Sequence, residues 1–161
     1  MLFAFCQWIE QSPVGVTIHQ STWQFPLLEV VHILGIVLLV GGTSIVDLRL
    51  TGLALTDESV SKLARQFLPW AWVGLAVQIV TGLLLFASEA TKMYGNPWFE
   101  LKLVLLLVAC INALLFHFLA YRGVGKWDSD PVAPMPARAA GTLSILLWIG
   151  VVAAGRWMGY A

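Results

Sequence analysis

The sequence predicts an all-α integral membrane protein, a four-helix bundle with a short interfacial helix at its N-terminus. Of its 161 residues, 59% are hydrophobic and 11% are charged, whereas about 25% are charged in an ordinary soluble domain. The mean hydropathy is +0.83. Four stretches reach the roughly 20 mainly apolar residues that cross a bilayer as a helix. We therefore expect residues 1–161 to form a single transmembrane domain in contact with lipid.

The first 23 residues precede the first long apolar stretch and include the segment FAFCQWIEQ. In a helix built from this segment, the apolar residues fall on one side, and Gln7, Glu10 and Gln11 are the polar residues interspersed with them in the sequence. This pattern favours a short helix in the membrane interface. A loosely ordered tail is the alternative. The segment has no basic residue and only a very short apolar run, so it does not resemble a cleaved signal peptide.

Four predicted spans follow, and tryptophans near their ends suit the membrane interface. The spans cover about residues 25–46, 67–87, 98–121 and 139–160. The first connection contains TDES, which is expected to cap a short helix. The second contains the turn signal YGNP. The third, GVGKWDSDPVAPMP, has prolines and glycines that exclude a helix.

Basic residues indicate the orientation of the spans. The first and third connections with their flanks contain Arg49, Lys62, Arg65, Arg122, Lys126 and Arg138. The N-terminal segment has no basic residue, and the second connection has only Lys92. Because cytoplasmic loops collect Lys and Arg, we expect both termini to face outward, into the periplasm if the membrane is a bacterial inner membrane.

Charge and cysteine content exclude several other classes. Nine basic residues balance nine acidic ones, so no nucleic-acid partner is indicated. Cys6 and Cys110 are far apart in the sequence, which argues against a disulfide framework or a zinc site. No nucleophile and base stand in a pattern that is typical of a hydrolase.

Ionisable groups inside the spans are the candidate functional residues, because such groups are costly in a bilayer. The direction in which each span crosses the membrane divides these ionisable groups by depth. An outer cluster contains Glu29, His32, Lys102 and Arg156, and an inner cluster contains Asp47, Arg49, Arg65, His117 and Arg122. Several have simpler interpretations. The inner arginines are expected to anchor the inner face, Asp47 and Arg49 would then pair at a helix end, and Lys102 would reach the surface along its stem.

The outer cluster suits a haem b group that transfers electrons near the outer face. A neutral imidazole inside a helix bundle is a good axial ligand for haem iron, and His32 lies well inside an apolar run. Lys102 and Arg156 are placed to bind the propionates. His19 is a candidate sixth ligand from the outer surface, and Glu29 would orient an imidazole or pair with Arg156. Glycines at positions 35, 74 and 82 would leave space for a flat macrocycle.

Two other functions stay open at this point. One is a periplasm-facing copper protein that uses His32 with Glu29 and His19, with Met158 as a nearby thioether. The other is a scaffold or accessory subunit of a membrane complex, whose polar groups only fix helix packing. Gly155 is followed four residues later by another glycine, a spacing that favours close helix contact or a homo-oligomer.

The depth of His117 separates it from this outer site. His32 lies about seven residues below the start of its span and His117 about nineteen below the start of its own, and both spans begin at the same face. The two therefore differ in depth by roughly 18 Å, so we expect that His117 does not share a haem with His32.

Three segments are similar to a family of small bacterial four-helix membrane proteins of unknown function, namely FPLLEVVHILGIVLLVGG, PWFELKLVLLLVACINALLFH and GVVAAGRWMGY. This resemblance covers nearly the whole chain and implies the fold. More distantly, the first and third spans resemble copper-resistance-D type membrane domains, which in turn resemble four-helix b-type cytochromes. That likeness implies haem or copper handling at the periplasmic face, with His32 as ligand. The chain departs from the di-haem pattern, because its three histidines cannot supply two matched pairs.

Overall fold

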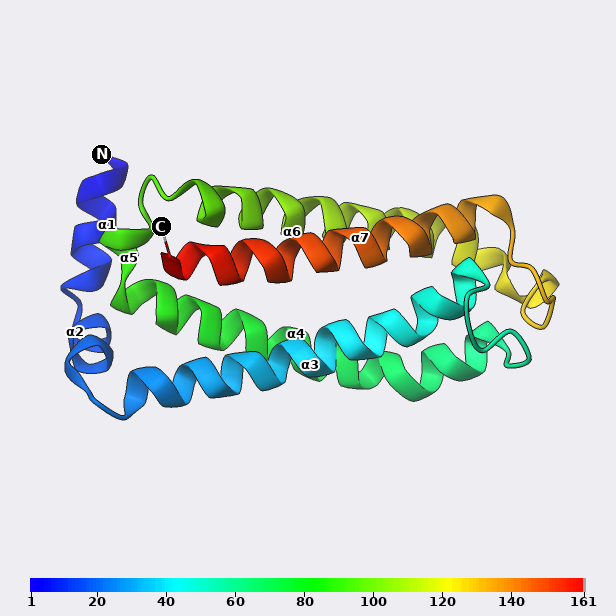
Figure 1. The fold of residues 1–161 in the computed structure, drawn as a ribbon, viewed down its shortest axis with the longest axis horizontal. Helices are drawn as coiled ribbons and strands as arrows, with labels where there is room; N and C mark the ends of the chain where they lie inside the picture. The colour runs from blue at the N-terminus through cyan, green and yellow to red at the C-terminus, as the bar shows by residue number, and fades with distance from the viewer. Residues whose placement is uncertain (161) are drawn as a thin grey trace.

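A computed structural model describes residues 1–160 of the chain, and every regular element in that range is helical (Figure 1). The α-helices are α1 (Leu2–Glu10), α2 (Pro13–Gln20), α3 (Gln24–Thr51), α4 (Val60–Ser88), α5 (Ala90–Met93), α6 (Pro97–Leu115) and α7 (Met135–Trp157). Three shorter helical segments are η1 (Phe116–Ala120), η2 (Tyr121–Lys126) and η3 (Met158–Tyr160). The all-α four-helix membrane bundle predicted from the sequence is confirmed. Residue 161, the end of the predicted domain, lies outside the described residues.

Four helices are long and apolar enough to cross a membrane, and each is longer than the predicted span. They cover Gln24–Thr51, Val60–Ser88, Pro97–Lys126 and Met135–Tyr160. Hydropathy locates the apolar centre of a helix but not its polar ends, which explains the difference. The expected short helix after TDES is absent, because these residues lead directly into α4. The third connection was expected to lack any helix, but it begins with the last turns of the 3₁₀ segment η2.

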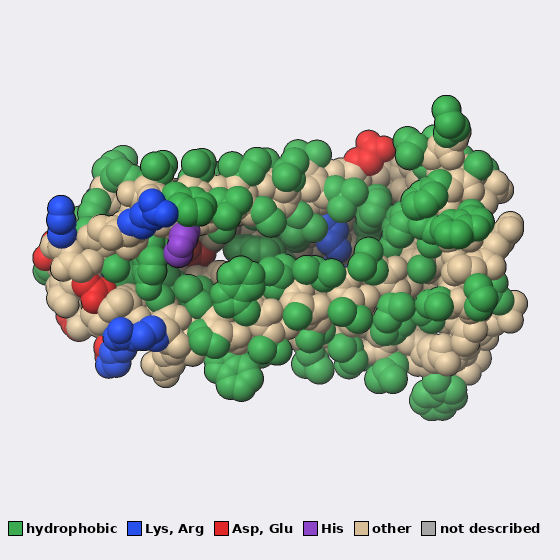
Figure 2. Space-filling model, turned by 180° about the vertical axis from the view of Figure 1, so that it is seen from behind, with side chains coloured by type: hydrophobic (Ala, Val, Ile, Leu, Met, Phe, Trp, Pro, Cys, Tyr) green, Lys and Arg blue, Asp and Glu red, His purple; other side chains and the backbone are tan. Residues whose placement is uncertain are grey.

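The four long helices form two antiparallel pairs, α3 with α4 and α6 with α7 (Figure 1). Helix α3 joins the pairs by packing against α7. Within residues 1–160, α4 and α6 make no extended contact, and their aromatic contact is the stack of Phe86 on Phe99, with ring centroids 5.6 Å apart. An opening is visible between the two pairs in the space-filling view (Figure 2). The bundle is therefore closed along α3 and α7 and open along α4 and α6.

Helices α3 and α4 approach so closely that glycine is required at their contact. A Cβ on Gly74 would lie 2.5 Å from the amide nitrogen of Leu39, and one on Gly35 would lie 2.8 Å from the side chain of Val77. Small residues permit such backbone approach in membrane helices. The expectation that positions 35 and 74 leave space for a macrocycle is therefore wrong, since the partner helix fills both.

Arg49 joins the two loops at the end of the bundle where α3 ends. The residue is fully buried. Its Nε donates to the carbonyl of Glu58 at 2.6 Å and its Nη2 to the carbonyl of Asp130 at 2.8 Å. The expected pair with Asp47 does not form, because the Asp47 carboxylate accepts from Ser144 Oγ at 2.6 Å instead. Arg49 is thus a connector of loops rather than an anchor in the lipid headgroups.

Asp128 caps the start of α4 from the same loop region. Its carboxylate accepts hydrogen bonds from both the backbone amide and the hydroxyl of Ser61. Burial acts to raise the pKa of Asp128, but the Ser61 hydrogen bonds and the positive charges of Arg65 and Arg49 outweigh it and hold the pKa below its usual value. A carboxylate at a helix N-terminus is stabilising. This contact therefore stabilises the start of α4 and joins it to the third connection.

The N-terminal segment forms two short helices, where a single one was expected, and both lie across the end of the bundle at which α3 and α6 begin (Figure 1). A Cβ on Gly15 would lie 2.6 Å from the carbonyl oxygen of Ala87, so α2 sits directly on the end of α4. The Glu10 carboxylate accepts from the amide and hydroxyl of Thr91, at 2.7 and 2.6 Å. These contacts exclude the alternative of a loosely ordered tail.

Candidate functional site

His32 and Thr81 form the polar contact at the centre of the candidate site. Nδ1 of the half-buried His32 on α3 lies 2.7 Å from Oγ1 of Thr81 on α4, and Thr81 is only 4% exposed. The same hydroxyl donates to the carbonyl of Val77 at 2.6 Å. A hydroxyl carries a single hydrogen, so with that hydrogen given to Val77, Nδ1–H is the donor to Thr81. The neutral imidazole therefore keeps its unprotonated lone pair on Nε2.

Two further residues of α4 lie against His32. A Cβ on Gly82 would lie 3.5 Å from Cε1 of the ring, so a glycine stands beside the imidazole. The side-chain amide of Gln78 donates to the backbone carbonyl of His32. Gln78, Thr81 and Gly82 lie within little more than one turn of α4, so a single short stretch of α4 surrounds this histidine of α3. Within residues 1–160, Nε2 makes no hydrogen bond.

Lys102 comes from the other helix pair, and its positive charge acts on His32. The half-buried side chain crosses the position of Gly155 on α7, where a Cβ would lie 3.6 Å from Nζ. Its ammonium has no hydrogen bond or ion pair among residues 1–160. Lys102 and His32, both members of the expected outer cluster, therefore interact through charge without a direct bond, and the role of the cluster stays a prediction.

Arg156 and Glu29, the other members of that cluster, are both exposed. Nη2 of Arg156 donates to the hydroxyl of Tyr160 at 2.5 Å, and its guanidinium lies 4.8 Å from the centroid of the Tyr160 ring. No ion pair joins Glu29 to Arg156 in the described part of the chain. Glu29 and Arg156 are therefore on the surface, whereas the side chain of Lys102 is half-buried.

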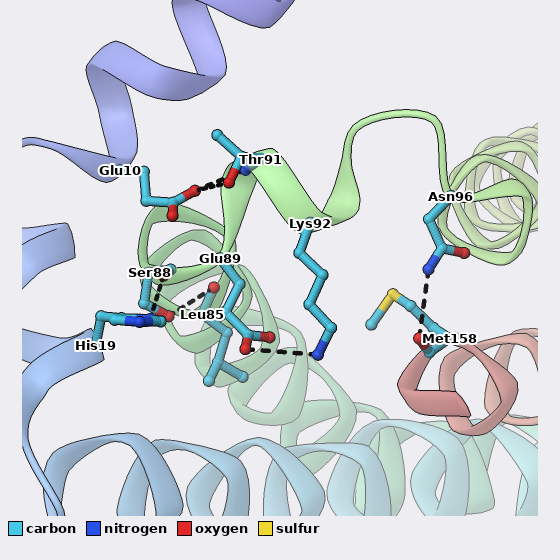
Figure 3. Close-up of polar contacts among 9 residues, drawn as sticks. All are labelled: Glu10, His19, Leu85, Ser88, Glu89, Thr91, Lys92, Asn96 and Met158. Atoms are coloured by element: carbon cyan, nitrogen blue, oxygen red, sulfur yellow. Dashed lines mark hydrogen bonds and ion pairs between the residues drawn. The ribbon is translucent and has the colours of Figure 1, made fainter. Parts of the chain in front are cut away.

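His19 lies on α2, at the end of the bundle where α3 begins, and Figure 3 shows its contact with Ser88. Its Nδ1 donates to the carbonyl oxygen of Ser88 at 3.1 Å. Ser88 follows Thr81 by seven residues on α4, which corresponds to about 10 Å along the helix. His19 instead borders a surface cavity of about 260 Å³ together with Glu89. The structure therefore does not place the His19 and His32 rings where both could bind the same metal atom.

His117 stands on η1, near the opposite end of the molecule. The ring is exposed and stacks on Tyr121, with centroids 5.9 Å apart. Fifteen residues separate it from Lys102 along the same span, or about 22 Å of helix. This placement agrees with the predicted separation of His117 from the His32 site.

The partners of His32 were the part of the site that sequence reasoning missed. These partners are Gln78 and Thr81, two polar residues of the second span to which the sequence assigned no role. Their spacing of three residues, which puts both on one helix face, was the available signal. Among residues 1–160, no group of three or more His, Cys, Asp or Glu side chains is arranged to hold a metal ion.

Comparison with known proteins gives a family without a function. No curated protein and no solved structure matches the chain. The likeness to copper-resistance-D type domains and to four-helix b-type cytochromes therefore stays a prediction. A family model does match residues 5–161. The chain belongs to DUF6644, a family of unknown function.

Proposed function

We propose that this protein is an integral membrane haem b protein in which Nε2 of His32 is the axial ligand. The observation that carries the proposal is the chain of hydrogen bonds from His32 through Thr81 to Val77. Ligating histidines typically donate their other ring nitrogen to an acceptor that fixes the tautomer and the ring orientation. Thr81 supplies that acceptor, so Nε2 is left as a lone-pair donor of the kind haem iron uses.

Lys102 supplies the charge that an anionic cofactor needs. An ammonium within the bundle is costly unless an anion accompanies it, and no acidic side chain pairs with Lys102 among residues 1–160. A haem propionate is an anion of suitable kind, and Arg156 stands next to Gly155 as a second cation at the surface. When bound, the haem would supply one-electron transfer, while His32 and Lys102 hold and orient it.

The same proposal includes a direction in the membrane. The six basic residues expected on the inner face lie at the end where α3 ends and α7 begins, and the candidate site lies toward the opposite end. We propose that this opposite end, with both termini, faces the periplasm across a bacterial inner membrane. In cells whose two native cysteines are replaced, Gln20→Cys should react with an impermeant thiol reagent and Ser129→Cys should not; the reverse pattern contradicts the orientation.

Copper handling gains no comparable support, because His19 is bonded to Ser88 away from His32, and no group of three or more His, Cys, Asp or Glu side chains in residues 1–160 is arranged for a metal ion. A scaffold role, within a homo-oligomer or a larger complex, would explain the helix contacts but not an unpaired cation whose charge acts on an oriented imidazole. An absorption spectrum and a metal analysis of the detergent-purified protein, produced with haem supplied, test the proposal. One haem b per chain supports it. Copper without haem, or neither in a well-folded protein, overturns it.

A further inference from the structure

A groove of about 410 Å³ lies on the lipid-facing side of the contact between α3 and α7, away from the His32 site. Thr51, the last residue of α3, forms one edge. Arg138 and Thr142 of α7 form its polar part, and Leu143 and Leu146 continue it along the helix. Because eight residues separate Arg138 from Leu146, the groove extends about 12 Å from the helix end toward the middle of the bundle.

The walls of this groove are fixed by the packing beneath them. A Cβ on Gly141 would lie 3.0 Å from Cβ of Leu50, so α3 and α7 are in direct contact at this level. One turn farther along, Ser144 donates to the buried carboxylate of Asp47 at 2.6 Å. The two helices are therefore joined on both sides of Thr142, and this contact fixes the position of α7 against the end of α3.

The polar groups of the groove differ in the ion pairs and hydrogen bonds that they can still form. Arg138 is exposed and forms no ion pair among residues 1–160, and it lies in the first turn of α7, where the helix dipole also favours an anion. The hydroxyls of Thr51 and Thr142 already donate to the carbonyls of Leu48 and Arg138, at 2.9 and 3.0 Å. Both hydroxyls can therefore only accept further hydrogen bonds. The pattern is complementary to an anion at Arg138 and to donor groups at the threonines.

We infer that the groove binds an anionic phospholipid whose headgroup carries hydroxyl groups, as phosphatidylglycerol does. Its phosphate would pair with Arg138 and its glycerol hydroxyls would donate to Thr51 and Thr142. An acyl chain would then lie along Leu143 and Leu146, which are 42% and 61% exposed. The position suits such a ligand, because α7 crosses from headgroup level into the apolar core within these two turns. A free phosphate would use Arg138 but leave the apolar part of the groove uncovered.

Native mass spectrometry of the detergent-solubilised protein tests this inference, with phosphatidylglycerol, phosphatidylcholine and inorganic phosphate as probes. We expect one phosphatidylglycerol to remain bound, and phosphatidylcholine to be retained much less. Arg138→Gln should weaken that binding about fivefold or more, since one basic residue near anionic headgroups contributes an effect of that order. Thr142→Val should remove part of the preference for phosphatidylglycerol over phosphatidic acid, which lacks the glycerol hydroxyls.

Lys126→Gln is the matched control, because it removes one exposed charge from the same end of the bundle outside the groove. It should leave phosphatidylglycerol binding unchanged. Helical content measured by circular dichroism verifies that each variant is folded. Equal retention of phosphatidylcholine, displacement of the lipid by inorganic phosphate alone, or equal loss in the Lys126→Gln and Arg138→Gln variants would each overturn the inference.

Discussion

The Thr81 hydroxyl lies 2.7 Å from Nδ1 of His32 and 2.6 Å from the carbonyl oxygen of Val77. The hydroxyl therefore acts as donor to its own helix and as acceptor to the imidazole. Through this one residue, α4 determines which nitrogen of a histidine on α3 keeps its lone pair. A ligand histidine needs such an orienting partner, and the free Nε2 is the basis of the proposed haem site.

Thr81→Val tests this orienting contact, because valine keeps the shape of threonine and removes the acceptor. We expect haem retention to weaken by about tenfold or more, the usual cost of losing a partner of a ligating histidine. Thr81→Ser, which restores a hydroxyl, should recover most of the retention. Haem content after gel filtration measures both variants. Undiminished retention in Thr81→Val would show that the contact does not position the ligand.

Gly74→Ala tests the close contact between α3 and α4. The added Cβ would lie 2.5 Å from a backbone nitrogen of α3, so the helices must move apart. We expect a loss of about 1–3 kcal/mol in the free energy of unfolding, as for other overpacked contacts. Gly41→Ala is the matched control, since nothing lies within 4 Å of its added Cβ. Unfolding in a mixed detergent series measures both, and equal stability of the two variants would contradict this contact.

Arg49→Met tests the connection between the two loops. The substitution removes two part-buried hydrogen bonds that the fully buried Arg49 donates to the carbonyls of Glu58 and Asp130. We expect a loss of about 2–4 kcal/mol, because a hydrogen bond from a charged group contributes roughly 1.5–3 kcal/mol. Lys126→Met, at an exposed position in the same region, should change stability little. If Arg49→Met unfolds at the same detergent fraction as the wild type, the proposed connection contributes nothing.

Glu10 makes the docking of α1 dependent on pH. The hydrogen bonds from Thr91 lower the pKa of Glu10 below its ordinary value, against the opposing effect of burial, with a further contribution from the charge of His19. A lowered folded-state pKa gives stability that is complete above the unfolded pKa, about 4.3 for Glu, and is lost as the pH falls through the folded value. Hydrogen exchange in α1 should therefore be slow near neutral pH and accelerate below about pH 4.

Glu10→Ala is the corresponding variant, and it should exchange α1 amides faster at neutral pH and show little further change on acidification. Exchange in the central turns of α3 provides the internal reference. A wild-type α1 that is equally protected on both sides of this pH range would refute the dependence on Glu10.

The four spans could be predicted because hydropathy is a property of about 20 consecutive residues and needs no knowledge of their neighbours. The pairing of His32 with Thr81 could not, since it depends on the register of α3 against α4 over a separation of 49 residues. The glycines show the same limit. A glycine beside open space and a glycine packed against a partner helix look alike in sequence. Of positions 35, 74 and 82, only Gly82 is not filled by the partner helix, and it lies beside the imidazole of His32.

Arg49 shows how burial can reverse an expectation. A basic residue at the end of a span usually anchors the headgroup region. Here two loops that are distant in sequence close over it and offer carbonyl oxygens, so it becomes fully buried. In contrast, helix direction alone predicts that Lys102 and His32 lie toward the same end of the bundle, because position along each span is set by counting residues.

The measurement that tests the account most directly is the haem content and reduced-minus-oxidised spectrum of His32→Ala beside His117→Ala. Both variants remove one imidazole from a membrane span, but only His32 is oriented by Thr81 and acted on by the charge of Lys102. We expect the His32→Ala protein to lose its haem, and the His117→Ala protein to keep the wild-type content and spectrum. Loss of the same haem in both variants, or its full retention in His32→Ala, would contradict the proposed site.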